Sequence, residues 1–168
     1  MTAETRPPRN YQTGPVTVWL RRGSVILTIA VTVLLLVRYA SLPETVPTHF
    51  GLTGEADAWG PRWSLLALAA LLCGVIFGAV WLSSRPQLFN YPIVITETNA
   101  AAVYREGERM LVWVTLATVL IYAATVFAAM GWSVSAVFLA VLLGLVLSVV
   151  VGLIRVVAAR NWIGEDAE

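Results

Sequence analysis

The sequence predicts an all-α integral membrane protein built as a bundle of four transmembrane helices. The first observation is composition: 58% of the 168 residues are hydrophobic and only 12% are charged, whereas about a quarter of a soluble domain is charged. The second is that the charges leave long gaps, of 22 residues at 63–84 and 45 residues at 110–154. Because about 20 helical residues cross a hydrocarbon core about 30 Å thick, these gaps predict one span and two spans, respectively.

The first predicted span covers residues 20–40. Only residues 23–37 are free of charge there, between the Arg21-Arg22 pair and Arg38. The segment reaches spanning length if Arg38 lies within the helix and extends its guanidinium to the interface. A cleaved signal peptide is the alternative. The residues around its cleavage site should be small and uncharged, whereas Arg38 stands at that place in this chain. We therefore expect the helix to be retained.

The remaining spans are predicted at residues 63–84, 110–130 and 134–154. The helix of the second span is expected to begin at Pro61, since proline suits the first helical position, where its missing N–H is not needed. The third and fourth separate at Gly131, which weakens helical structure. Tryptophans mark the predicted span ends, as in an interfacial aromatic belt: Trp19, Trp63, Trp81, Trp113, Trp132 and Trp162.

Outside the spans, the sequence predicts two tails and a partly helical loop. Residues 1–18, rich in proline, are predicted to be a disordered tail, and residues 164–168 a second tail, on either side of a membrane domain at 19–163. Residues 85–109 are predicted to be a loop that ends in a helix continuous with the third span. Thr96 or Thr98 is predicted to cap this helix, which then runs through Glu97, Tyr104 and Glu108.

The arginines predict the orientation, because the chain contains no lysine. Four spans place both termini and the 85–109 loop on the same side of the membrane. Nine arginines fall on that side: Arg6, Arg9, Arg21, Arg22, Arg85, Arg105, Arg109, Arg155 and Arg160. Only Arg38 and Arg62 fall on the other. Positive charge collects in cytoplasmic loops, so we expect both termini inside and the 41–62 loop outside.

Small residues four positions apart predict where helices approach each other closely in lipid. Gly74 and Gly78 have this spacing in the second span, and Gly144, Ser148 and Gly152 in the fourth. Two interpretations stay open, packing within one bundle and a seam between two copies of the chain in a homo-oligomer.

The predicted external loop, residues 41–62, contains the candidate binding residues. Prolines that fix φ and glycines that permit otherwise closed turns recur along it, so we expect a compact, ordered loop. The candidates are His49, Asp57, Phe50, Trp59, Glu44 and Arg62. The two aromatic residues are expected to anchor the loop on the outer end of the bundle, and Asp57 to close a turn.

His49 has a structural and a chemical interpretation. In the structural one, its imidazole hydrogen-bonds to the loop backbone or to Asp57 and holds the loop in shape. In the chemical one, His49 and nearby carboxylates form a metal or acid–base site. A single histidine matches no usual zinc spacing, where two or more His or Cys ligands are the rule, so we predict no metal. Arg38 and Arg62 are expected to reach the interface, with Glu44 and Asp57 as alternative partners.

The external loop also carries a family resemblance. It reads LPETVPTHFG over residues 42–51 and GEADAWG over residues 54–60. This pattern, LPxxVPTHFGxxGxxDxWG after a first membrane helix, resembles the membrane family called domain of unknown function 1648, which also occurs in SdpI-type immunity proteins of bacteria. The resemblance implies a bacterial membrane protein with a role in immunity to a secreted peptide. The chain departs from the pattern at Pro61-Arg62, where a small residue and a lysine are usual.

These observations favour a non-enzymatic protein of the cell membrane whose external loop binds a peptide or partner protein, in immunity or sensing. One alternative is a hydrolase or metal-dependent enzyme using His49 and Asp57, and another is an accessory subunit of a larger membrane complex. The predicted spans hold no acidic residue or histidine, which disfavours a proton relay. No basic patch lies outside the membrane flanks, so we expect no nucleic-acid partner. The expected partner is the lipid bilayer, and no cofactor is expected.

Overall fold

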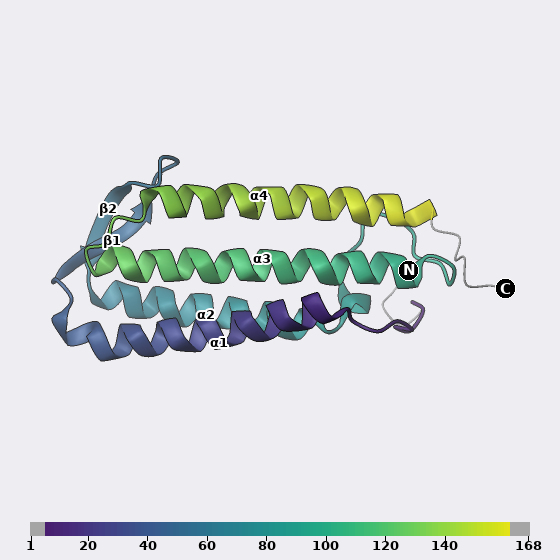
Figure 1. Ribbon diagram of the computed structural model, residues 1–168, viewed down its shortest axis with the longest axis horizontal. Helices are drawn as coiled ribbons and strands as arrows, with labels where there is room; N and C mark the ends of the chain where they lie inside the picture. The colour runs from purple at the N-terminus through teal and green to yellow at the C-terminus, as the bar shows by residue number, and fades with distance from the viewer. Residues whose placement is uncertain (1–5, 162–168) are drawn as a thin grey trace.

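The computed structural model describes residues 6–161 and contains four long helices with a small sheet at one end (Figure 1). The helices are α1 (Pro15–Arg38), α2 (Trp63–Ser83), α3 (Ala100–Ala129) and α4 (Ser135–Ala158). All four are long and apolar enough to cross a membrane. Short 3₁₀ turns are η2 (Tyr39–Ser41), η3 (Pro86–Leu88) and η4 (Ala159–Asn161). The number and order of the helices were therefore predicted correctly from the sequence.

Helix α1 begins earlier than predicted, at Pro15 rather than residue 20. Gly14 is its extended N-cap residue, and proline stands at the first helical position, where its fixed φ is already helical. Residues 15–18 therefore do not belong to a disordered tail. Residues 6–14, predicted to be disordered as well, lie against the end of the bundle that also holds η3. The remainder of that predicted tail, together with Trp162 and residues 164–168, lies outside the described residues.

Helix α3 is a single helix of 30 residues that includes the predicted approach to the third span. A reciprocal pair of hydrogen bonds closes the turn before it: the Thr96 N–H donates to Asn99 Oδ1 at 2.9 Å, and the Asn99 N–H donates to Thr96 Oγ1 at 3.3 Å. This arrangement has the geometry of a capping box, which satisfies backbone donors at a helix start. The N-cap residue of α3 is Asn99, so the prediction that Thr96 or Thr98 caps the helix was wrong. Thr98 bonds to the Thr96 hydroxyl.

Helix α3 is the centre of the fold. It contacts α1 and α2 on one side and α4 on the other, whereas α1 and α2 contact each other less and α4 packs mainly on α3 (Figure 1). Within the predicted four-helix bundle, three helices thus pack together and α4 lies against α3. An all-apolar helix carries no stripe to show which neighbour it meets, so the sequence could not predict this asymmetry.

The core of the three-helix bundle is apolar with one polar bridge. Its fully buried side chains include Leu35, Ile76 and Val126. At its middle, the Thr32 hydroxyl lies 3.1 Å from the Tyr122 hydroxyl and 3.4 Å from Cys73 Sγ. Since Thr32 also donates to the carbonyl of Thr28 at 2.8 Å, the three polar groups satisfy one another and connect α1, α2 and α3.

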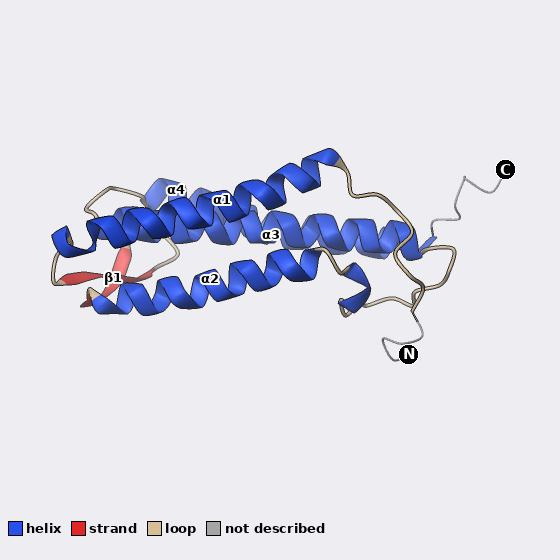
Figure 2. Cartoon of the chain, turned by 90° about the horizontal axis from the view of Figure 1, so that it is seen from below, coloured by secondary structure: helices blue, strands red, loops and turns tan. Residues whose placement is uncertain are grey.

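Residues 41–62 contain two strands, which the all-α prediction missed. Strand β1 (Thr45–Phe50) pairs antiparallel with β2 (Ala56–Pro61), from Thr45 opposite Pro61 to Phe50 opposite Ala56. The sheet lies at the end of the bundle opposite both described chain ends (Figure 2). Two prolines and a glycine within the strands obscured the alternation from which a strand is normally recognised.

The small residues of the two predicted ridges have different surroundings. Gly74 and Gly78 are exposed, and a Cβ at either would meet nothing within 4 Å, which contradicts packing within the bundle at these two positions. Gly144 is equally open, and the Ser148 hydroxyl donates to its carbonyl at 2.7 Å. Only Gly152 lies in a tight contact, because a Cβ there would stand 2.2 Å from the Met110 side chain of α3.

Candidate functional site

The hairpin formed by β1 and β2 is fixed to the bundle rather than free. Val46 is fully buried in the core of the three helices. Phe50 stacks on Phe138 of α4, with ring centroids 4.8 Å apart and an interplanar angle of 27°. Gly54, in the turn, lies so close to α4 that a Cβ would stand 2.3 Å from the carbonyl oxygen of Ser135. The predicted anchoring by Phe50 is therefore present, and the hairpin is held by α4 as well as by the core.

His49 and Asp57 form an ion pair or hydrogen bond across the hairpin, as the structural interpretation proposed. His49 Nδ1 lies 2.5 Å from Asp57 Oδ1, and the side chains are 69% and 53% exposed. Because exposed pairs contribute about 0–1 kcal/mol, this contact shapes the tip of the hairpin without stabilising it strongly. Asp57 belongs to β2 and does not form the predicted Asx turn.

Two further predicted residues lie at the other end of the hairpin. The Arg62 N–H donates to the Glu44 carbonyl at 2.8 Å, which closes the base of the hairpin through the backbone. The Arg62 guanidinium donates to the Leu42 carbonyl at 3.4 Å and lies over the Tyr39 ring. Within residues 6–161, neither Arg38 nor Arg62 forms an ion pair with Glu44 or Asp57. The six candidates therefore make no single cluster.

Trp59 lies on the rim of a cavity rather than in an anchoring contact. The cavity, of about 280 Å³, separates the hairpin from the α3–α4 connection and is lined by Pro47, Phe50 and Trp59 on one side and by Gly131 and Trp132 on the other. Trp59 is 61% exposed. Its indole is thus available to an incoming group, and the prediction that it anchors the loop was wrong.

Strand β2 is an exposed edge of the sheet. The sheet has only two strands, and the side chains of Asp57, Ala58 and Trp59 are all exposed. An edge strand presents backbone N–H and C=O groups that can pair with an added strand. The hairpin therefore combines an open backbone edge with an aromatic side chain beside a cavity.

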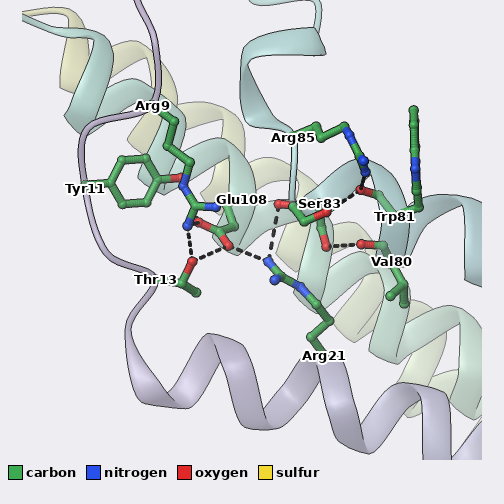
Figure 3. A network of polar contacts seen from close by, with 10 residues as sticks. Arg9, Tyr11, Thr13, Arg21, Val80, Trp81, Ser83, Arg85 and Glu108 are labelled. Carbon is green, nitrogen blue, oxygen red and sulfur yellow. Dashed lines mark hydrogen bonds and ion pairs between the residues drawn. The ribbon is translucent and has the colours of Figure 1, made fainter.

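A second polar site lies at the opposite end of the bundle, around Glu108 of α3 (Figure 3). The carboxylate is 1% exposed. One oxygen, Oε1, accepts from the Thr13 hydroxyl at 2.8 Å and from the Arg21 guanidinium. The other, Oε2, accepts from the Tyr11 hydroxyl at 2.7 Å and from Arg9 at 3.4 Å. Four donors from the N-terminal segment and α1 thus surround one buried carboxylate of α3.

The same network reaches α2, because Arg21 also donates to the Ser83 carbonyl at 3.3 Å (Figure 3). Burial, and then the hydrogen bond to Glu108, raise the pKa of Tyr11 well above its usual range. The phenol therefore stays protonated and keeps its donor role at physiological pH. Since both carboxylate oxygens are saturated by donors, the arrangement suits a structural clamp better than an open general base.

Little in the sequence indicated the Glu108 network. The four donors lie 87 to 99 residues from Glu108 along the chain, and three of them fall in the segment predicted to be disordered. One signal was present, since Glu108 stands two residues before a stretch of 45 uncharged residues. A carboxylate so close to an apolar span needs partners, and arginines are present in the N-terminal segment and at the start of α1.

Metal binding has no evident site in the part of the chain that the structure describes. Within residues 6–161 there is no group of three or more His, Cys, Asp or Glu side chains placed to hold a metal ion.

Comparison with known proteins finds a family match for the segment that contains the hairpin. The family model "Domain of unknown function (DUF1648)" matches residues 26–73, as the pattern in residues 42–60 predicted. An uncharacterized protein of Archaeoglobus fulgidus is 58% identical over 36 residues, which is 21% of this chain and 20% of that protein. The chain thus matches only about a fifth of that relative's length. No solved structure shows significant similarity to the chain.

Proposed function

From the DUF1648 segment at residues 26–73, which comprises the hairpin and the adjoining halves of α1 and α2, we propose that this is a multi-pass protein of the cell membrane that binds a peptide through the hairpin. The binding is non-enzymatic and serves immunity or sensing. The observation that carries the proposal is Trp59, an exposed indole beside a cavity on an edge strand that is fixed to the bundle.

The backbone edge of β2 and the cavity beside Trp59 bind different parts of the peptide. An extended peptide adds a strand along β2 and gains main-chain hydrogen bonds, which give affinity with little sequence preference. One apolar side chain of the peptide enters the cavity between Trp59 and Trp132, which gives specificity. Because Phe50 and Gly54 hold the hairpin against α4, the edge is already ordered before binding, so less conformational entropy is lost.

The charge of the hairpin favours a cationic peptide. Residues 41–62 contain three carboxylates, Glu44, Glu55 and Asp57, against one guanidinium, Arg62, with His49 counted as neutral. All three carboxylate residues are exposed. Complementary charge accelerates encounter and selects partners, more than it adds affinity. We therefore expect the bound peptide to be basic with at least one large apolar residue.

Peptide selection tests this function. Phage-displayed random peptides would be selected on the protein in nanodiscs, after depletion on empty nanodiscs, and their affinities measured. Replacing Trp59 with alanine should weaken binding by about thirtyfold, since an aromatic hot spot contributes about 2 kcal/mol. Trp63→Ala is the matched control, because Trp63 is equally exposed, at 63%, but starts α2 and does not line the cavity.

Two results would contradict the proposal. One is the failure of any selected peptide to discriminate between Trp59→Ala and Trp63→Ala. The other is binding that requires His49 and is followed by cleavage of the peptide, which would favour the hydrolase alternative.

The proposed orientation places the hairpin outside the cell and both chain ends in the cytoplasm. It is supported by the nine arginines on the side of the termini against two on the side of the hairpin. In a Cys73→Ser background, a membrane-impermeant maleimide should label Thr53→Cys in intact cells. It should label Gln12→Cys only after permeabilisation. Both positions are exposed, so the reverse pattern would show the opposite orientation.

A further inference from the structure

Helices α3 and α4 line a continuous groove along their contact. At the end near the chain termini, a cleft of about 260 Å³ is lined by Arg105, Glu106 and Arg155. A second cleft of about 280 Å³ shares Glu106 and Arg155 with the first. A third, of about 530 Å³, shares Trp113, Leu147 and Ser148 with the second. Because neighbouring clefts share lining residues, the three form one groove that is charged at one end and apolar at the other.

The charged end carries an excess of positive charge. Arg109 and Arg155 stand there against a single carboxylate, that of Glu106, whereas Arg105 lines the outer cleft with its guanidinium over the Tyr11 ring. Arg109 donates to Glu106 Oε1 at 2.6 Å, and Arg155 lies 3.7 Å from Glu106 Oε2. One carboxylate neutralises one of these two guanidinium groups, so a formal charge of +1 remains. The side chains of the two paired arginines are 43% and 61% exposed, which leaves guanidinium N–H groups free for an anion.

The apolar end suits a hydrocarbon chain. Besides Trp113 and Leu147, its lining includes Leu116 and Leu120 of α3 and Gly144 of α4. Because a Cβ at Gly144 would meet nothing within 4 Å, the missing side chain widens the groove. Ser148, the one hydroxyl in the lining, donates to its own helix at the carbonyl of Gly144 and so offers no donor to a ligand.

We propose that this groove binds one anionic phospholipid, with the phosphate at Arg109 and Arg155 and an acyl chain along the α3–α4 groove. Basic pockets between membrane helices are suited to anionic headgroups, and the apolar continuation distinguishes a lipid from a soluble phosphate. The lipid would supply α4 with a second packing partner besides α3. The site is separate from the hairpin, so lipid binding can be tested independently of peptide binding.

Native mass spectrometry of the purified protein tests the proposal, with dioleoyl phosphatidylglycerol and dioleoyl phosphatidylcholine as probes. We expect phosphatidylglycerol to bind at least tenfold more tightly. The double variant Arg109→Gln/Arg155→Gln should lose that preference. The matched control is Arg22→Gln/Arg85→Gln, which removes two arginines of the same end that lie over Trp19 and Trp81 and outside the groove. It should keep the preference.

Two further variants distinguish the contribution of the lipid headgroup to binding from that of the acyl chain. Glu106→Gln removes the competing carboxylate and should strengthen phosphatidylglycerol binding severalfold, a gain that misfolding could not mimic. Gly144→Leu should weaken binding of both lipids by filling the apolar part. Equal binding of the two lipids, an unchanged preference in Arg109→Gln/Arg155→Gln, or full competition by glycerol 3-phosphate would each overturn the proposal.

Discussion

Replacing Glu108 with alanine is expected to destabilise the folded protein by about 3–5 kcal/mol, the usual cost of removing one partner of a buried ion pair. The alanine would leave the Arg21 guanidinium, on a side chain that is 19% exposed, and the hydroxyl of Thr13 without their acceptor. It would also release the N-terminal segment, because the Tyr11 hydroxyl bonds to the same carboxylate. Denaturant unfolding in detergent micelles, followed by circular dichroism, measures the change in the free energy of unfolding.

The matched control is Glu97→Ala, since Glu97 is exposed and precedes α3. We expect its effect to stay within about 0.5 kcal/mol, as for ordinary surface substitutions. Glu108→Gln should lie between the two, because the amide keeps one acceptor oxygen but loses the charge. A double-mutant cycle with Arg21→Met should show a coupling of at least about 1 kcal/mol. Equal stability of Glu108→Ala and Glu97→Ala would refute the clamp.

The second large effect is expected for Gly54→Ala, which should destabilise the packing of the hairpin by about 2–4 kcal/mol, the sum of a backbone cost and a collision. Gly54 has a φ of +76°, a backbone conformation that costs other residues about 1–2 kcal/mol. In addition, its Cβ would collide with the backbone of Ser135 at 2.3 Å, and backbone yields less readily than a side chain. The hairpin must then move away from α4 and lose the Phe50–Phe138 stack.

Gly131→Ala separates the two contributions. Gly131 has a φ of +86°, but a Cβ there would meet nothing within 4 Å. The control therefore carries the conformational cost without the collision. Thermal unfolding of both variants in the same detergent gives the comparison, and Gly54→Ala should be the more destabilising of the two. If both glycines tolerate alanine equally, the close approach of the hairpin to α4 has no energetic importance.

The features that the lipid solvent imposes were the most predictable from the sequence. Long uncharged stretches must be helices if they lie in lipid, because every backbone group has to be satisfied internally, and all four helices were found. The ends were less accurate where a helix continues beyond the apolar stretch, as α1 does to Pro15 and α3 to Ala100. The ends of an uncharged stretch indicate where the chain leaves the lipid. The helix itself can continue beyond that point until its capping residue.

Contacts between distant segments were not predictable in the same way. The prolines in residues 41–62 suggested an ordered loop but concealed its strands, and His49 and Asp57 were correctly considered as partners because they are near in sequence. The Glu108 network depends on segments about 90 residues apart. No local periodicity encodes such a pairing, so it required the three-dimensional structure.

The network around Glu108 also constrains the order in which the protein can be completed during synthesis. Arg9, Tyr11, Thr13 and Arg21 leave the ribosome first, but their common acceptor is added only after α1, the hairpin and α2 have been made. Domains emerge from the N-terminus onward, so the guanidinium of Arg21 has no carboxylate to meet until α3 arrives. The first two helices are therefore made before the network at the Arg21 end of α1 can form, and the synthesis of Glu108 completes it.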